Sequence, residues 1–165
     1  MTNAKRIFCL VMLLALSACG FQLRGEANLP FATLYLESAN SESPLLDELR
    51  RNLEINKVNL VSRAEDAEVV LNIISEAPDK QILTLGGTGR VNEFQLRYRV
   101  ALRAYDKAQQ ELITDEEILL QRDFQYDDTQ ILAKEAEEAL LVRSMYSEMA
   151  QRIVRRLGRI HPTRQ

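Results

Sequence analysis

The segment Phe94–Ala104, with the sequence FQLRYRVALRA, decides the fold. Apolar side chains occupy every second position, and mostly polar side chains lie between them. Successive side chains of a β-strand point to opposite faces of the sheet, so this alternation predicts a strand with one buried face and one wet face. The wet face carries three arginines, Arg97, Arg99 and Arg103.

Extended segments flank this strand in the sequence. The run 69–74, VVLNII, is rich in β-branched residues and predicts a buried strand that continues towards Leu85. Pro78 lies within that extension, and because proline lacks an N–H we expect an interruption, a bulge or a sheet edge there. Turns at 86–89 and 106–110 separate the central strand from its neighbours. Residues 33–37 and 111–126 predict two further strands, and Arg122 interrupts the apolar face of the second, which suggests a position at the end of the sheet.

Two segments have helical periodicity. Ser43 and Pro44 are typical of a helix start, and the leucines that follow at helical spacing predict a helix over 44–56. A longer apolar stripe predicts a helix over 130–157, preceded by the potential capping residues 127–129 and ended by Gly158. In this helix Glu148 and Arg152 are spaced for an i,i+4 ion pair.

The order of these elements is strand, helix, three strands, helix. We therefore predict an α+β fold in which a four-stranded sheet packs two helices on one face, a two-layer α/β sandwich formed by residues 31–158. The arginine-bearing face of the sheet points away from the helices and stays wet.

The N-terminal segment is typical of an exported protein. Lys5 and Arg6 precede the apolar run 7–16, which is too short to cross a bilayer and resembles a secretory signal. The string 16–19, LSAC, resembles the bacterial lipobox, in which the cysteine becomes the acylated first residue. This resemblance implies a signal peptide at 1–18, lipidation of Cys19, a tether at 19–30 and a C-terminal tail at 159–165. An ordinary signal peptide with an incidental cysteine is the alternative.

Composition narrows the range of functions. The formal charge is −3, and removal of residues 1–18 leaves 19 basic against 24 acidic residues, a side-chain charge of −5. Such a chain lacks the basic excess of a nucleic-acid-binding protein, so we expect no nucleic acid partner. Cys9 leaves with the signal and acylation consumes Cys19, so no intrachain disulfide is expected.

The sequence offers little material for catalysis. The turn 86–89 lacks the GK[ST] ending of a phosphate-binding loop, and His161, the sole histidine, follows the last predicted helix. Acidic runs at 115–117 and 127–128 are typical of solvated turns and helix starts. No cluster has metal-ligand spacing, so we predict no catalytic residue, metal site or cofactor.

Two features favour an anionic ligand. Arginine binds phosphate through a planar fork, and Arg97, Arg99 and Arg103 form a row on one strand. Lys134 lies near the N-terminus of the long helix, an end that attracts anions. The alternatives are a solvated sheet face for the arginines and an i,i+4 pair with Glu138 for Lys134.

Three segments of the sequence resemble a known family. The segment 19–25, CGFQLRG, is similar to the opening of the mature chain in the lipopolysaccharide-assembly lipoproteins of the LptE (RlpB) family. The segment 92–96, NEFQL, resembles the entry to that family's central strand, and 132–134, LAK, resembles the start of its last helix. Gly20, directly after the cysteine, resembles the sorting pattern of outer-membrane lipoproteins.

The resemblance implies a non-enzymatic protein that is lipid-anchored to the periplasmic face of the outer membrane. Family members plug the lumen of the outer-membrane β-barrel LptD, assist its assembly and bind lipopolysaccharide. Lys134 matches a lipopolysaccharide-binding lysine of the family, and Arg90 is offset from a second basic position. The alternatives are another outer-membrane lipoprotein acting as an envelope assembly or scaffold module, and a lipid-anchored periplasmic hydrolase.

Overall fold

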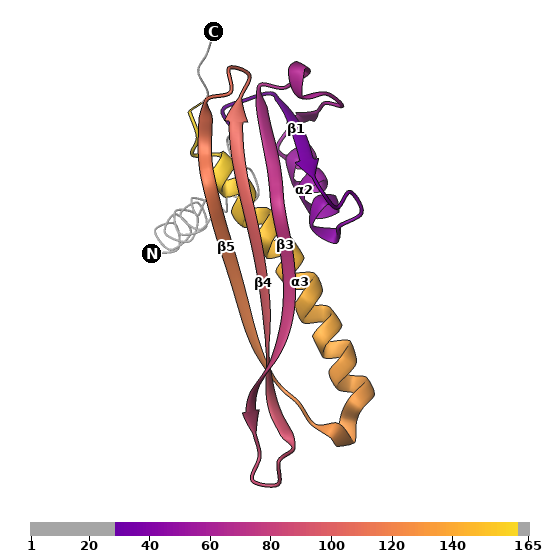
Figure 1. The fold of residues 1–165 in the computed structure, drawn as a ribbon. Helices are drawn as coiled ribbons and strands as arrows, with labels where there is room; N and C mark the ends of the chain where they lie inside the picture. The colour runs from indigo at the N-terminus through magenta and orange to yellow at the C-terminus, as the bar shows by residue number, and fades with distance from the viewer. Residues whose placement is uncertain (1–28, 162–165) are drawn as a thin grey trace, which may run out of the picture.

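A five-stranded sheet lies in front of two helices in the computed structural model, which describes residues 29–161 (Figure 1). The prediction of an α+β fold with both helices behind one sheet face is confirmed. The signal peptide, Cys19 and most of the predicted tether and tail lie outside the described residues. The elements are β1 Thr33–Ser38, α2 Pro44–Ile55, β2 Asn59–Leu60, η1 Ala64–Asp66, β3 Val69–Leu85, β4 Val91–Asp106, β5 Glu111–Gln125, η2 Asp128–Gln130 and α3 Ile131–Leu157.

The sheet has the strand order β2-β1-β3-β4-β5. β1 runs parallel to both β2 and β3, whereas β3, β4 and β5 form an antiparallel meander. The prediction of four strands was wrong, because β2 adds a fifth. β2 spans two residues that pair with Thr33 and Leu34, and two residues are too few to show an alternating pattern.

β3 continues through Pro78 as one strand of 17 residues. β1 pairs with β3 only as far as Ile73, and the register of β3 against β4 shifts between Ile73 and Ser75. Beyond that point β3 pairs within the described chain only with β4, so Pro78 lies in an edge segment. The predicted sheet edge is present at Pro78, whereas the register shift lies before it and Pro78 itself pairs regularly with Tyr98. An edge position explains how the strand tolerates a residue without an N–H.

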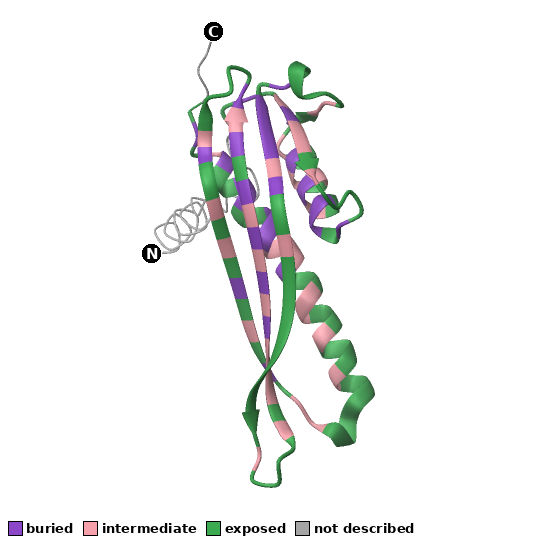
Figure 2. Cartoon of the chain, viewed as in Figure 1, coloured by how far each residue is buried: buried purple, intermediate pink, exposed green. Residues whose placement is uncertain are grey.

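The core is concentrated in the half of the molecule that contains β1 and α2 (Figure 2). Four leucines of α2 and six apolar residues in the C-terminal half of α3 are buried there. The N-terminal half of α3 extends past α2, and its Leu132 and Leu140 are 81% and 65% exposed. We call the well-packed end, at which α3 terminates, the proximal end. The opposite end, formed by residues 82–93 and 125–134, is the distal tip.

A hydrogen-bonded group joins α2, β3 and β4 beside this core. Ser43 caps α2 by accepting from the N–H of Leu45 at 3.1 Å, and its Oγ donates to Glu76 Oε2 at 2.5 Å. The Tyr98 hydroxyl donates to Glu76 Oε1 at 2.6 Å. Burial, and then the hydrogen bond to Glu76, raise the pKa of Tyr98 above its ordinary value. Glu76 therefore satisfies two hydroxyls from two other elements.

Several details differ from the sequence-based predictions. Asp127 caps η2, which occupies the place where the long helix was expected to begin, and α3 starts at Ile131. Gly158 ends α3 with a right-handed φ of −68°, so its position does not need the freedom of glycine. Arg122 is not at the end of the sheet. It pairs with Glu148 of α3, which explains how an arginine fits among the apolar residues of β5.

Glu148 also forms the predicted i,i+4 pair with Arg152, at 2.8 Å. Within residues 29–161, no helix combines the length and the apolar character that crossing a membrane requires.

Candidate functional site

The distal tip brings Arg90 and Lys134 to the same end of the molecule. Arg90 closes the turn after β3, where its carbonyl accepts from the N–H of Gly86 at 2.7 Å and Gly89 has a φ of +78°. Its guanidinium lies 3.1 Å from Asp128 Oδ2, which ties the hairpin to η2. Lys134 follows in the first turn of α3 and pairs with Glu137 at 2.8 Å. Lys134 therefore forms an i,i+3 pair within the helix, and not the i,i+4 pair with Glu138 that was the alternative to a ligand-binding role.

Lys134 borders a polar hollow of about 620 Å³ at this tip. Asp127 also lines the hollow, and hydrogen bonds from Thr129 are the main reason that its pKa is lowered, with Lys134 a smaller contributor. The side chain of Lys134 is 19% exposed, whereas that of Arg90 is 69% exposed. The remaining lining residues carry hydroxyl, amide and carboxyl groups: Thr84, Asn92, Glu93, Gln125, Tyr126 and Gln130.

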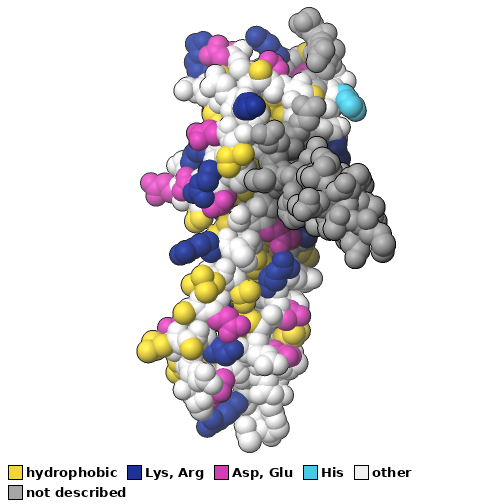
Figure 3. All heavy atoms as spheres, turned by 180° about the vertical axis from the view of Figure 1, so that it is seen from behind, with side chains coloured by type: hydrophobic (Ala, Val, Ile, Leu, Met, Phe, Trp, Pro, Cys, Tyr) yellow, Lys and Arg dark blue, Asp and Glu magenta, His cyan; other side chains and the backbone are white. Residues whose placement is uncertain are grey.

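Exposed apolar side chains lie beside these cations. Figure 3 shows apolar side chains on the surface of the lower part of the molecule, which contains the tip. Those of β3 are 44–60% exposed, and those of α3 are 47% and 81% exposed. They are Ile82, Leu83, Leu85, Ile131 and Leu132. A cationic group beside apolar surface suits an anionic amphiphile better than a fully polar anion.

The arginine row lies away from this tip, on the sheet face opposite the helices. Arg97 donates to Gln81 Oε1 at 3.2 Å and is the cross-strand neighbour of Asp79. Arg99 lies 3.1 Å from Glu117. Arg103 borders a separate hollow that it shares with Glu37 and Asp115. Acidic neighbours therefore offset the positive charge of the row, and the structure does not bring it together with Lys134.

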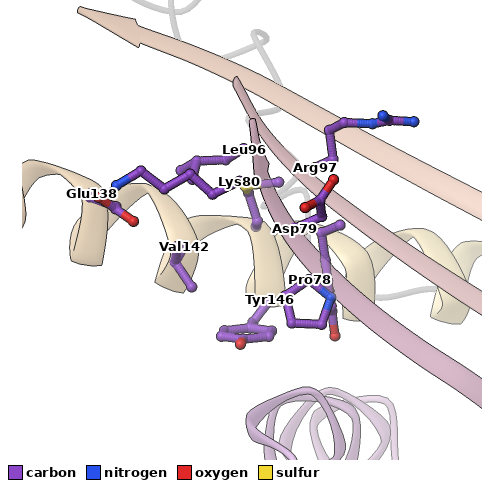
Figure 4. Close-up of a pocket in the computed structure, with 10 residues that line it drawn as sticks. Pro78, Asp79, Lys80, Leu96, Arg97, Glu138, Val142 and Tyr146 are labelled. Carbon is purple, nitrogen blue, oxygen red and sulfur yellow. Dashed lines mark hydrogen bonds and ion pairs between the residues drawn. The ribbon is translucent and has the colours of Figure 1, made fainter. Parts of the chain in front are cut away.

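Lys80 was missed by the sequence analysis. Its Nζ lies 2.5 Å from Glu138 Oε2, 4.3 Å from the ring centroid of Phe94 and 5.6 Å from that of Phe124. Figure 4 shows Lys80 extending from β3 towards Glu138 on α3. The pair borders a largely apolar hollow of about 210 Å³ whose other lining residues include Pro78, Leu96, Val142, Met145 and Tyr146. Nothing in the local spacing of the sequence signals a pair 58 residues apart.

Lys80→Glu is expected to loosen the N-terminal half of α3 from the sheet. The change removes the cation from the aromatic rings, a contact worth about 0.5–2 kcal/mol, and places a carboxylate against Glu138. We expect amide hydrogen exchange over residues 134–142 to accelerate about tenfold, since 1.4 kcal/mol corresponds to a factor of ten. Exchange over residues 149–157 should stay unchanged.

The double variant Lys80→Glu/Glu138→Lys provides the control, because it restores an ion pair with the acidic and basic residues exchanged. It should recover much of the protection, whereas Lys107→Glu in an exposed turn should lose none. Unaltered exchange over 134–142 in Lys80→Glu would show that the pair does not hold the helix.

Comparison with known proteins gives a consistent family match. The family model LptE, described as "Lipopolysaccharide-assembly", matches residues 31–157. The LPS-assembly lipoprotein LptE of Pectobacterium atrosepticum is 29% identical over 158 residues, covering 92% of this chain and 85% of that protein. Its counterpart in Yersinia pestis is 30% identical over 162 residues, covering 94% of this chain and 77% of that protein.

Solved structures agree with the fold. A lipoprotein B of Nitrosomonas europaea superposes with a TM-score of 0.71 at 37% identity, covering 82% of this chain and 88% of that one. The rare lipoprotein B of Shewanella oneidensis superposes with a TM-score of 0.66 at 31% identity, covering 74% of this chain and 90% of that one. The similarity therefore covers both the sheet and the helices.

Proposed function

Because the chain belongs to the LptE family of lipopolysaccharide-assembly lipoproteins, we propose that it plugs an LptD-like outer-membrane β-barrel and binds lipopolysaccharide during transport to the cell surface. In this proposal Cys19 is acylated and anchors the chain to the periplasmic face of the outer membrane. The proposed role is binding and assembly, and it assigns no catalytic residue and no cofactor.

The sheet face that bears the arginines supports the plug role. A large barrel has a polar, water-filled lumen, so a plug inside it needs polar surface of mixed charge. Arg97 and Arg99 lie on such a face with acidic side chains beside them, Asp79 and Glu117. This arrangement suits contact with a lumen wall better than capture of a concentrated anion, so we rank the row below the tip as a lipopolysaccharide site.

The juxtaposition of cations and apolar surface at the distal tip carries the lipopolysaccharide-binding part of the proposal. Arginine and lysine bind phosphate through charge-assisted hydrogen bonds, and Arg90 and Lys134 supply one of each. Leu132 and Leu85 supply exposed apolar surface nearby for acyl chains. Arg90 closes the turn between β3 and β4, and Lys134 and Leu132 lie in the first turn of α3, so the ends of long elements hold the site.

Co-purification tests the partner. The chain carrying an affinity tag after Gln165 should recover a large β-barrel protein in near-equal amount from detergent extracts of the outer membrane. An unrelated outer-membrane lipoprotein with the same tag is the control and should not recover it. Isolation of the tagged chain without any barrel would contradict the plug role, and mass spectrometry of the same sample reports whether Cys19 is the acylated first residue.

A further inference from the structure

Four arginines lie close together where α3 ends. Arg152, Arg155 and Arg156 follow the spacing i, i+3, i+4, which places side chains on one face of a helix. Arg159 follows the end of the helix and borders the same surface hollow as Arg156. We call this set the arginine face. All four side chains are exposed. A concentration of arginines this dense is unexpected in a chain whose processed form carries an excess of acids.

The acidic neighbours of the arginine face neutralise only part of it. Arg152 pairs with Glu148 at 2.8 Å, and Arg156 pairs with Glu116 of β5 at 2.7 Å. Glu148 is shared with Arg122 of β5, so it already serves two arginines. Within residues 29–161, Arg155 and Arg159 take part in no ion pair.

A surface hollow of about 370 Å³ lies beside the arginine face. Arg156 and Arg159 line it together with Thr114 and Glu116. Its apolar lining comes from Leu112, Ile113 and Ile160. Two guanidinium groups and a hydroxyl next to apolar side chains suit the phosphate and adjoining glycerol of a phospholipid headgroup.

The arginine face lies at the proximal end, where the described chain also begins and which is therefore connected to Cys19 by a short segment. α3 ends at the same end at which β1 begins (Figure 1), and the described chain starts at Leu29, ten residues after Cys19. Ten residues span at most about 35 Å when fully extended. An acylated Cys19 therefore keeps this end near the leaflet that holds its lipid.

We propose that the arginine face binds the phosphate groups of anionic glycerophospholipids in the leaflet to which the chain is anchored. The placement of that leaflet rests on the lipid anchor of the proposed function. Basic side chains close to an anionic leaflet are attracted to its surface, and this attraction falls off with distance and salt. The contact would hold the proximal end at the surface of that leaflet.

Vesicle co-sedimentation tests the proposal without relying on lipidation. The processed chain carrying Cys19→Ser is mixed with vesicles of phosphatidylglycerol and phosphatidylcholine in equal amounts, or of phosphatidylcholine alone. We expect salt-sensitive binding to the first and about tenfold weaker binding to the second. Arg155→Glu/Arg159→Glu should weaken binding to the anionic vesicles about tenfold or more, whereas Arg155→Lys/Arg159→Lys should retain most of it.

Arg50→Glu/Arg143→Glu is the matched control, because it makes the same change in net charge elsewhere on the surface. The proposal would be overturned if Arg155→Glu/Arg159→Glu bound anionic vesicles as well as the chain with an unaltered arginine face does. It would also be overturned if the control variant lost as much vesicle binding as Arg155→Glu/Arg159→Glu. Arg155→Glu/Arg159→Glu should leave lipopolysaccharide binding unchanged. If this variant lost lipopolysaccharide binding and kept vesicle binding, the arginines would belong to a lipopolysaccharide site instead. A native chain that proves unacylated at Cys19 contradicts the anchor but not this contact.

Discussion

Glu76→Ala is expected to lower the free energy of unfolding by about 3 kcal/mol, because it removes the shared acceptor of two hydroxyls. The Ser43 side chain is fully buried and the Tyr98 side chain is 2% exposed, so water cannot easily replace the lost carboxylate. The α2 cap depends on the orientation of Ser43, so the loss extends beyond the two bonds. Urea unfolding of the purified chain measures the change.

Related variants separate this group from a general surface effect. Ser43→Ala and Tyr98→Phe each remove one of the two bonds, and their losses should not add to that of Glu76→Ala because the three residues act together. Glu93→Ala removes a half-buried carboxylate whose one hydroxyl partner, Thr84, is exposed, and should cost less than about 0.5 kcal/mol. A loss equally small for Glu76→Ala would mean that the group does not join α2 to the sheet.

The elements with a strong period were predictable from the sequence. The alternation at 94–104 predicted the central strand, and the structure extends it to Val91–Asp106, so that it fills the space between the predicted turns at 86–89 and 106–110. The leucines of 44–56 predicted α2 to within one residue. These elements carry their burial pattern locally, so each can be inferred without its partners.

The features that the sequence did not predict depend on contacts between distant segments. β2 exists because β1 offers it an edge, and its two residues have no pattern of their own. The position of Arg122 in the helix-facing side of β5 is explained by Glu148, which lies 26 residues later. The pairing of Glu138 with Lys80 instead of Lys134 has the same origin, since tertiary proximity competes with spacing along the helix.

The candidate site also has some residues that the sequence could identify and some partners that it could not. The sequence could identify Lys134 as a basic residue near a helix start, and the family resemblance added Arg90 as a candidate. The structure places both at the distal tip. Their counter-ions, Glu137 and Asp128, could not be selected from several nearby acids. The acidic neighbours of the arginine row were equally hidden, because they lie across strands rather than along one.

Lys134→Glu/Arg90→Glu is expected to reduce the affinity for lipopolysaccharide by about tenfold or more. A hydrogen bond to a charged group contributes about 1.5–3 kcal/mol, and reversing both charges replaces attraction by repulsion. Titration of the purified chain with fluorescently labelled lipopolysaccharide measures the affinity. Both side chains are partly or largely exposed, and their present ion pairs are of the kind that contributes little to stability, so the fold should be retained.

The counter-ions of these two cations provide a test with the opposite sign. Asp128→Asn/Glu137→Gln frees both cations from their pairs and should strengthen binding, whereas the reversal of the cations weakens it. Replacing the row Arg97, Arg99 and Arg103 with glutamine should change affinity less than the tip variant does, because acidic neighbours already offset the charge of the row. If the glutamine variant of the row lowered the affinity and the tip variant did not, the lipopolysaccharide site would lie on the open sheet face. The comparison is informative because acidic neighbours neutralise more of the positive charge on the row than at the tip.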